Sequence, residues 1–591
     1  MAKNRNEVSE NLKWRLTDIF KDGEEFENLL ADVTKRADRS HYEGKLSDKK
    51  VLLKCLKEMD SIDADLEKLD VYAYMKKDLD ARDSSSTALL TRVENVLIQY
   101  SSSLAFMTPE ITALPEEELK AIIADPEFSD YDYMLSCLLK EKPHVLSKEC
   151  ENLLALGGQV FSGFHDIFSM INNADLPFPE IEVDGKNVTV SHGMYGVLLQ
   201  SEDRAVREKA FKAYYKAFIS LINTISATYI GNVNTDVYLA RARKYGSCLE
   251  KALSQEDVEP AVYENLLESV EEGLPVLHRY IKDRKDILGV EELHMYDVYT
   301  PLVENTDISL PYEEAFKLVK KGLAPLGEEY GKLLQRAHDE GWIDVEETEG
   351  KRSGAYSIDV YGMPHPYVLL NYQKTSHDVF TIAHELGHSM HSYHSDKYQP
   401  KAKASYKIFV AEVASTVNEV LLLKYLLKNS DDKKLKKYLC SYYMDMIRTT
   451  LFRQTMFAEF EYLAHDAAEK GVPLTKDYLN GKYLELNKKY YGNDIVSDDE
   501  IAYEWARIPH FYTSFYVYKY ATGIISAISI AERIYQEGKP AVEDYFRFLS
   551  SGGSDSPVNL LKLAGVDLTK KDAFKRAMDS FRSTLDEFEN L

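Results

Sequence analysis

The chain has 591 residues, of which 45% are hydrophobic and 29% charged. This composition excludes wholesale disorder, and the length predicts two or more lobes. The formal net charge of −25 argues against nucleic acid and anionic membranes as partners, because both need a basic protein surface.

The cysteines and the apolar segments suggest where the protein resides. The first residues, MAKNRNEVSENLKW, lack the apolar stretch of a signal peptide. No other segment approaches the roughly 20 uncharged apolar residues of a membrane span. The five cysteines form no CxxC pair, which predicts reduced thiols rather than a redox or thiolate metal site. We therefore expect a cytoplasmic protein.

From Asn11 to about Asn172 the chain has a repeated helical pattern, with apolar residues three and four apart. Asp184-Gly185 then lies between two alternating segments and predicts a small hairpin. Helical patterns resume after residue 200, where we place a boundary between a helical N-terminal lobe (1–200) and a second domain (201–591). The predicted helical segments are 46–70, 84–105, 116–124, 147–171, 201–245, 257–285 and 312–340.

Residues 341–373 read GWIDVEETEGKRSGAYSIDVYGMPHPYVLLNYQ and alternate like strands. After residue 376 the chain is helical nearly to its end. The predicted fold class is therefore mainly α (helix-rich α+β), with a small antiparallel sheet next to the helix that follows it.

That helix has the sequence DVFTIAHELGHSMHSYH, Asp378 to His394. Thr375 or Ser376 can cap it, and Asp378 places an acid in its first turn. One apolar stripe packs the helix against the protein. The stripe consists of Val379, Ile382, Leu386 and Met390.

His384 and His388 lie one turn apart on another face of this helix, so both imidazoles can reach one metal ion. Glu385 lies to one side, where it can act on water without binding the metal. Gly387 removes bulk between the two histidines. The alternative is a solvated helix that contains HExxH by chance.

The third metal ligand has three candidates. His394 has the spacing of the HExxHxxGxxH class, but His391 replaces the glycine of that turn. His391 itself lies near His388, although one straight helix cannot easily wrap three imidazoles around an ion. Glu412 lies in the apolar segment KIFVAEVASTVNEVLLLKYLL, where a buried carboxylate must be paired or bound to a cation. We favour Glu412.

Glu419 lies two turns after Glu412 on the same face of that segment. Its carboxylate can accept a hydrogen bond from a ligand imidazole and fix its tautomer. The alternative for either glutamate is an ordinary pair with an Arg or Lys of the core.

The motifs HELGHSMHSYH and FVAEVASTVNE resemble those of the thimet-oligopeptidase-like zinc peptidases, in particular the oligoendopeptidase F branch. The resemblance extends over essentially the whole chain. It includes WRLTDIF (14–20), KRSGAY (351–356), PYVLLNY (366–372) and IPHFYTSFYVYKYATG (508–523).

The resemblance implies two helical lobes around a deep substrate channel, with one Zn²⁺ on its floor. It implies that 201–591 is a zincin-like catalytic peptidase domain and that Glu412 is the third ligand. It also implies that His and Tyr side chains of the late helical region close over the substrate. His510, Tyr512 and Tyr516 occupy the matching stretch.

From the residues alone, Tyr512 and Tyr516 are four apart on one helical face with His510 beside them, as donors to an oxyanion would be. Core packing is the ordinary alternative, and Tyr518 and Tyr520 could take the place of either tyrosine.

The expected function is hydrolysis of internal bonds in short, unstructured oligopeptides by a zinc-activated water, with Glu385 as general base. A carboxypeptidase would need a cation such as Arg352 or Arg507 to anchor the terminal carboxylate. A peptide-binding protein with structural zinc would need a fourth protein ligand, and the sequence offers no convincing one.

Overall fold

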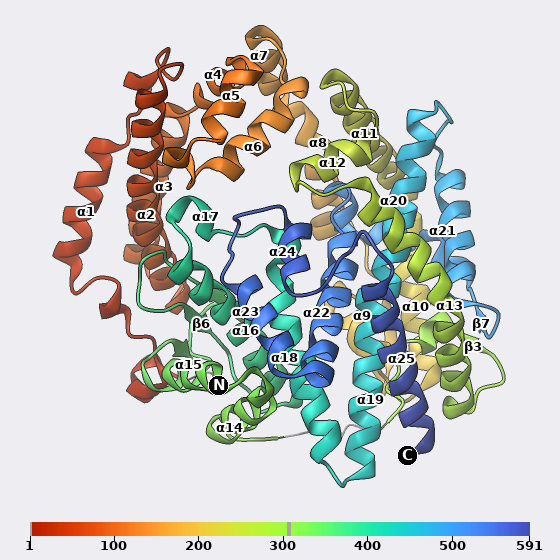
Figure 1. The fold of residues 1–591 in the computed structure, drawn as a ribbon. Coiled ribbons are helices and arrows are strands. Elements are labelled where there is room, and N and C mark those ends of the chain that lie inside the picture. Colours follow the sequence, from red (N-terminus) through yellow and green to blue (C-terminus); the bar gives the residue numbers. More distant parts are fainter. Residues whose placement is uncertain (1–2, 304–308) are drawn as a thin grey trace. The chain divides into compact units, whose positions relative to one another are not determined.

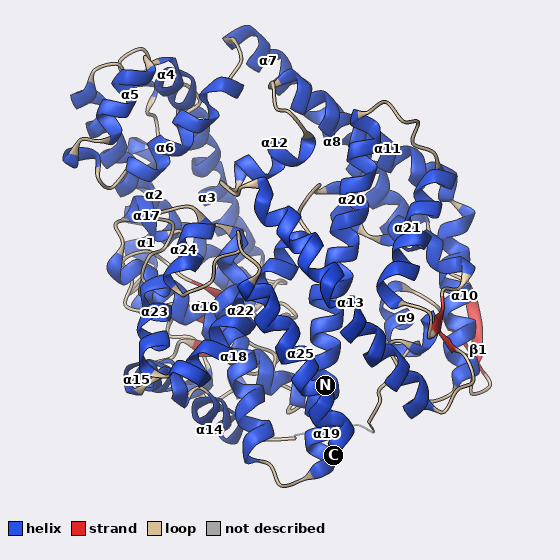
Figure 2. Cartoon of the chain, turned by 45° about the vertical axis from the view of Figure 1, so that its right-hand side comes forward, coloured by secondary structure: helices blue, strands red, loops and turns tan. Residues whose placement is uncertain are grey.

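The computed structural model describes residues 3–303 and 309–591, and nearly all of its regular structure is helical (Figures 1 and 2). Within the described residues the strands form only sheets of two or three strands, so the predicted helix-rich fold class is confirmed. None of the described helices combines the length and the apolar character that crossing a membrane requires.

The chain folds into two compact units, each made of separate stretches of sequence. Unit 1 comprises Met1–Val145, Asp307–Lys428 and Ser526–Val566. Its helices are α1 (Gly23–Arg36), α2 (Lys49–Leu79), α3 (Ser84–Ser103), α4 (Met107–Ala113), α5 (Glu116–Ile123), α6 (Asp132–Glu141), α14 (Tyr312–Gly322), α15 (Glu328–Asp339), α16 (Ser376–Tyr398), α17 (Lys401–Ala404), α18 (Ile408–Asn429), α23 (Lys539–Leu549) and α24 (Pro557–Leu563).

Unit 2 comprises Leu146–Thr306, Asn429–Ile525 and Asp567–Leu591. Helix α22 (Tyr518–Glu537) begins in unit 2 and ends in unit 1. The predicted boundary near residue 200 is a different division of the chain and stays a prediction. The other helices of unit 2 are α7 (Lys148–Leu156), α8 (Gly158–Met170), α9 (His192–Leu198), α10 (Arg204–Ser220), α11 (Ile222–Ala242), α12 (Cys248–Gln255), α13 (Pro260–Leu288), α19 (Lys433–Ile447), α20 (Arg453–Glu469), α21 (Lys476–Tyr491) and α25 (Asp572–Asn590).

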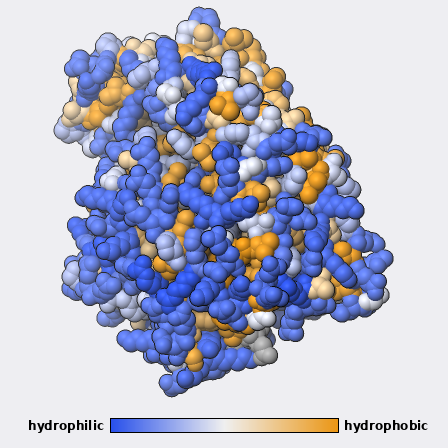
Figure 3. Space-filling view, turned by 90° about the vertical axis from the view of Figure 1, so that its right-hand side faces the viewer, coloured by the Kyte–Doolittle hydropathy of each residue, from blue (hydrophilic) through white to orange (hydrophobic). Residues whose placement is uncertain are grey.

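The helices are amphipathic, as the sequence pattern predicts. Helix α1, for example, buries Phe26, Leu30 and Val33 and directs its charged residues to solvent. Accordingly, polar residues cover most of the face shown in Figure 3, with apolar residues in smaller patches among them.

A three-stranded sheet of unit 1 lies next to α16, as predicted. It consists of β4 (Ile343–Asp344), β6 (Tyr367–Leu369) and β5 (Tyr356–Ile358), in that order. Strands β5 and β6 are antiparallel, as predicted, but β4 and β6 are parallel, so the prediction of an antiparallel sheet is wrong for this second pair. The connection from β4 to β6 contains β5 and is long enough for the chain to return in the same direction. The Ser357 hydroxyl of β5 is 2.8 Å from the Ser389 hydroxyl of α16.

Two of the motifs that carried the family resemblance support this sheet. Trp14, from WRLTDIF, donates its indole N–H to the carbonyl of Val368 at 2.7 Å and belongs to the same apolar core as Leu369. Lys351, from KRSGAY, forms a buried ion pair with Asp344 of β4 (2.7 Å). The two motifs therefore hold the sheet against which α16 packs.

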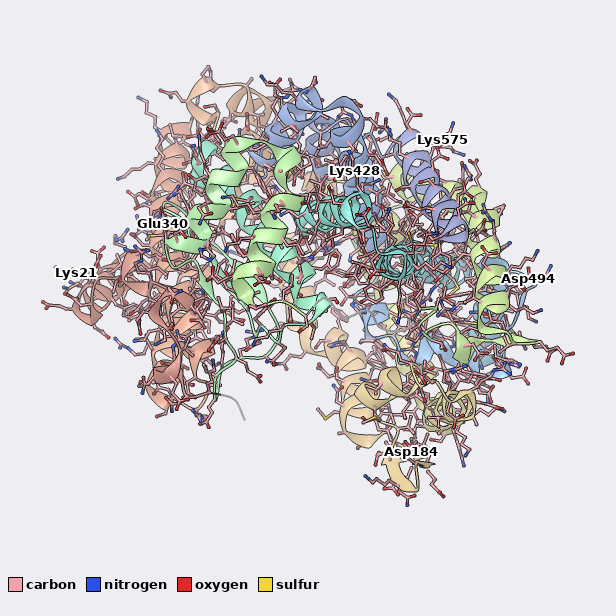
Figure 4. The ribbon with its side chains drawn as sticks, turned by 90° about the horizontal axis from the view of Figure 1, so that it is seen from below. Lys21, Asp184, Glu340, Lys428, Asp494 and Lys575 are labelled. Carbon is pink, nitrogen blue, oxygen red and sulfur yellow. The ribbon has the colours of Figure 1, made fainter. Side chains whose placement is uncertain are left out.

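Unit 2 contains the predicted hairpin, with β1 (Glu180–Val183) antiparallel to β2 (Lys186–Thr189). Asp184 and Gly185 form its turn with φ of 50° and 74°, and Figure 4 labels Asp184 at this turn. Two positive φ values are typical of the type I′ turn, which Asp-Gly favours. A second pair in this unit, β3 (Leu293–His294) and β7 (Ile495–Val496), is parallel.

Candidate metal centre

Helix α16 begins where the sequence predicts, at a capping box. The Thr375 hydroxyl accepts the Asp378 amide (3.2 Å), and the Asp378 carboxylate accepts the Thr375 amide (2.8 Å). These contacts satisfy amides that the first turn of a helix leaves without partners. The predicted stripe of Val379, Ile382, Leu386 and Met390 is buried, so the helix is fixed with its histidine-bearing face in one direction.

Helix α18 packs unusually close to α16 at Gly387. A Cβ on this residue would lie 2.5 Å from the Cα of Ser415 and 2.6 Å from the carbonyl oxygen of Ala414. Atoms of a packed interior do not approach this closely. Only glycine therefore allows α18 to bring its side chains to the face of α16 that carries the two histidines.

A buried polar chain holds the same two helices together. The side-chain amide of Asn418, on α18, donates to the carbonyl oxygen of Ala383 at 2.9 Å. The Tyr330 hydroxyl, on α15, donates to the Asn418 carbonyl oxygen at 3.0 Å. Asn418 is fully buried, so both contacts are costly to lose. They fix the backbone directly before His384.

The side chains of His384, His388 and Glu412 meet at one point. Their candidate ligand atoms all lie within 4.8 Å of one another, and they form the group that could hold a metal ion among the described residues. The two imidazole Nε2 atoms are 3.2 Å apart. The Glu412 Oε2 atom lies 3.3 Å from His384 Nε2 and 3.6 Å from His388 Nε2.

These spacings fit a tetrahedral metal. Metal–ligand bonds of about 2.0–2.1 Å in a tetrahedron separate the donor atoms by about 3.3–3.4 Å. Three electron-pair donors this close repel one another unless a proton or a cation lies between them. Two imidazoles and a carboxylate are also the donor set of catalytic zinc sites that keep one position open.

Glu419 contacts one of the candidate ligand imidazoles, where the sequence predicts a hydrogen bond. Its Oε1 accepts a hydrogen bond from Nδ1 of His384 at 2.5 Å, and His384 Nε2 faces Glu412 and His388. Burial lowers the pKa of His384, but hydrogen bonds to Glu412 and Glu419 outweigh it and raise the pKa to about 10. Burial also opposes ionisation of Glu412, yet both histidines hold the pKa of this carboxyl well below its usual range.

Glu412 has the expected neighbours but not the expected burial. Its side chain is 49% exposed, so the argument that a buried carboxylate must be paired is wrong for this residue. Helix α18 buries most of its length, whereas Glu412 lies in its first turns. The Ser415 hydroxyl, 3.2 Å from Glu412 Oε2, helps to orient it. The exposure leaves one side of the cluster open to solvent.

Glu385 is buried next to this cluster, with 7% of its surface exposed. Burial raises the pKa of its carboxyl, and the charges of His384 and His388 oppose the rise. A carboxylate with a raised pKa beside this cluster is a stronger base than an exposed glutamate.

Two further histidines of α16, His391 and His394, lie in its apolar packing rather than in the cluster. His391 stacks on Tyr406 with ring centroids 3.8 Å apart, and His394 packs edge-on against Phe546 at 5.0 Å. Burial lowers the pKa of His391 to about 3 and that of His394 to about 4. Both rings are therefore neutral packing groups, and neither belongs to the His–His–Glu group.

The aromatic segment 508–523 lies in unit 2, and the arrangement of its side chains differs from the prediction. His510 is 5.9 Å from Tyr516 between ring centroids, and the Tyr520 hydroxyl is 3.2 Å from His510 Nε2. The Tyr512 hydroxyl instead contacts Thr228 (2.6 Å). The predicted pairing of Tyr512 with Tyr516 on one helical face is therefore wrong, and the tyrosine hydroxyl that contacts His510 is that of Tyr520.

The reason lies in the backbone between these residues. Residues Pro509–Tyr512 form a 3₁₀ turn, and α22 begins only at Tyr518. Phe515 between them has a left-handed φ of 58°. Tyr512 and Tyr516 therefore do not belong to one continuous helix. A spacing of four residues does not place them on a common face.

Comparisons with known proteins agree with this geometry. The model of peptidase family M3 matches residues 197–580, and that of oligopeptidase F matches residues 110–178. The chain is 43% identical over 591 residues to oligopeptidase PepF of Bacillus subtilis (strain 168), covering 99% of this chain and 88% of that protein. It is 39% identical to group B oligopeptidase PepB of Streptococcus agalactiae, covering 100% of this chain and 99% of that protein.

Solved structures give the same result. A crystal structure from Chlamydophila abortus matches with a TM-score of 0.95 and 34% identity over 100% of both chains. The oligoendopeptidase-F of Enterococcus faecium matches with a TM-score of 0.73 and 35% identity, covering 96% of this chain and 98% of that one. The chain thus belongs to peptidase family M3, a family of metallopeptidases, and to its oligoendopeptidase F branch.

Proposed function

We propose that His384, His388 and Glu412 hold one zinc ion per chain and that the protein hydrolyses internal bonds of short, unstructured peptides. The observation that carries this proposal is the spacing of the three ligand atoms, which fits a tetrahedral metal with one open position. The bound metal would polarise the scissile carbonyl group and promote ionisation of water at this position.

In this proposal Glu385 is the general base. It accepts a proton from the attacking water and returns it to the amine that leaves. Its burial and its place beside both imidazoles support this role. Glu419 holds His384 in the tautomer that presents Nε2.

His510 and Tyr516 are the proposed donors to the oxyanion, and Tyr520 joins them. The contact between the Tyr520 hydroxyl and His510 Nε2 supports a shared hydrogen-bonding role. A preorganised donor of this kind commonly contributes a factor of about 100 or more to the rate. Tyr512 has no proposed role, since its hydroxyl is bonded to Thr228.

Oligopeptides are the proposed partners, and internal bonds the proposed sites of cleavage. The names of the relatives, oligopeptidase and oligoendopeptidase F, support this choice. A carboxypeptidase would need a free cation, but Arg507 is bonded to Glu504 (2.7 Å) and Arg352 contacts Tyr74 and Asp78. The cytoplasmic location stays a prediction.

An end-blocked, internally quenched peptide of about ten residues tests the proposal, because an exopeptidase cannot start from a blocked end. We expect cleavage at an internal bond, loss of cleavage with a chelator, and recovery on adding zinc. Cleavage of only the free-ended version would contradict the endopeptidase assignment. No cleavage of either peptide would contradict the peptidase assignment.

The third ligand has its own test. Glu412→Ala is expected to lower zinc affinity by about 10²-fold or more, since it removes one of three protein ligands. His391→Ala removes a neutral packing group and should cost stability while zinc stays bound. Zinc content measured after dialysis against a weak chelator separates the two. The opposite pattern would identify His391 as the ligand.

A further inference from the structure

We infer that Glu461 of α20 is a positioning residue that, through the backbone of Phe515, holds His510, Tyr516 and Tyr520 in one cluster. The inference rests on the roles proposed above for His510 and Tyr516. Every residue in this argument lies in unit 2.

The first observation is the backbone of Phe515. Its φ of 58° lies in the left-handed region, which residues with a Cβ rarely adopt. The side chain is almost completely buried, with 3% exposed. An unfavourable conformation of this kind persists only where surrounding contacts hold it, and such positions concentrate at functional sites.

The second observation is the contact that holds this conformation. The Phe515 amide donates to Glu461 Oε1 at 3.0 Å. Glu461 is fully buried, and among the described residues its Oε2 has no hydrogen-bond partner. Burial raises the pKa of Glu461 well above its ordinary value, and the hydrogen bond from the Phe515 amide opposes the rise.

The third observation is a second set of contacts at the same turn. The Ser514 hydroxyl donates to Asp236 at 2.6 Å. The His465 ring packs against the Phe515 ring at a tilt of 45°, with centroids 4.6 Å apart, and its Nδ1 donates to the carbonyl oxygen of Glu461 at 2.8 Å. Ser514 and Phe515 are therefore hydrogen-bonded to helices α11 and α20, respectively.

This turn connects the two sides of the aromatic cluster. His510 precedes it, and Tyr516 and Tyr520 follow it, with the Tyr516 and Tyr520 rings 5.5 Å apart. If Phe515 lost the Glu461 acceptor, its buried amide would be unpaired and the backbone would relax toward negative φ. That change would rotate Tyr516 away from His510. Glu461 thus acts on the cluster without touching the substrate.

Two substitutions of matched size test the inference. Glu461→Gln keeps a carbonyl acceptor for the Phe515 amide, whereas Glu461→Leu removes it. We expect Gln to keep kcat within about twofold of wild type, and Leu to lower kcat by about 10- to 100-fold with KM nearly unchanged, as misplacement of catalytic groups does. Zinc content should stay unchanged in both. Hydrogen–deuterium exchange should increase in residues 511–520 of the Leu variant only.

Ser514→Ala provides a second variant if Glu461→Leu does not fold, because it removes only the contacts of the neighbouring hydroxyl group, to Asp236 and Asn232. It should also increase exchange in 511–520 and lower kcat. An increase in exchange with unchanged kcat, or equal losses in the Gln and Leu variants, would overturn the inference. Unchanged exchange in both Leu and Ser514→Ala would do so as well. Wild-type kcat in His510→Ala and Tyr516→Phe would instead reject the proposed role of the cluster.

Discussion

Glu385→Gln is expected to leave zinc bound and to reduce peptide hydrolysis by about a thousandfold or more, as loss of a general base commonly does. Glutamine has the shape of glutamate but cannot accept the proton of the attacking water. Because Glu385 is buried and lies outside the His–His–Glu group, the ligand geometry should not change. The measurement pairs kcat for the blocked peptide with zinc content per chain.

Glu419→Gln is the matched control for this experiment. It makes the same chemical change, and its amide oxygen can still accept the hydrogen bond from His384 Nδ1. We expect a smaller loss of activity, of about tenfold, because an amide oxygen at position 419 accepts the hydrogen bond from His384 less strongly than a carboxylate does. Substantial turnover by Glu385→Gln, or equal losses in both variants, would contradict the assignment of Glu385 as base.

Gly387→Ala is expected to weaken zinc binding by about 100-fold, although it adds only one methyl group. The methyl carbon would lie 2.5 Å from the Ser415 Cα and 2.6 Å from the Ala414 carbonyl oxygen. Because these are backbone atoms, α18 must move away from α16, and Glu412 moves with it. Overpacking of this kind also costs about 1–3 kcal/mol of stability. Competition with a chromogenic chelator measures the zinc affinity.

Gly481→Ala is the control for the added methyl group. Gly481 lies within helix α21, and a Cβ there would meet nothing within 4 Å. Alanine favours a helix over glycine by about 1 kcal/mol, so this variant should be as stable as wild type or more so, with unchanged zinc affinity. A Gly387→Ala protein that binds zinc like the Gly481→Ala protein would show that close helix packing does not set the ligand geometry.

Helix α16 could be predicted from the sequence because the features that define it are local in the sequence. Its cap, its apolar stripe and the spacing of His384 and His388 all follow from helix geometry. Glu412 was identified from its segment, yet the burial argument for it was wrong. Periodicity shows that α18 is apolar on most sides, but it cannot show which turn reaches solvent. Asn418 was missed, although a polar residue in so apolar a segment is a signal of a buried contact.

The aromatic segment 508–523 could not be predicted in the same way. The sequence around Phe515 contains no glycine or asparagine to indicate a left-handed residue. The acceptor that stabilises this conformation is Glu461, 54 positions away in the sequence. The parallel pair of β4 and β6 was missed for a related reason. Each strand contributes too few residues for alternation to indicate direction.

The division of unit 1 into separate stretches has a consequence for synthesis of the protein. The side of α16 that carries His391 is covered by Phe548 of α23, with ring centroids 5.0 Å apart. All of residues 429–525, which belong to unit 2, are translated between these two helices. A nascent chain emerges N-terminus first, so it carries an incompletely covered HExxH helix until α23 leaves the ribosome. The packing that covers this side of α16 therefore forms only after residues 539–549 have been synthesised.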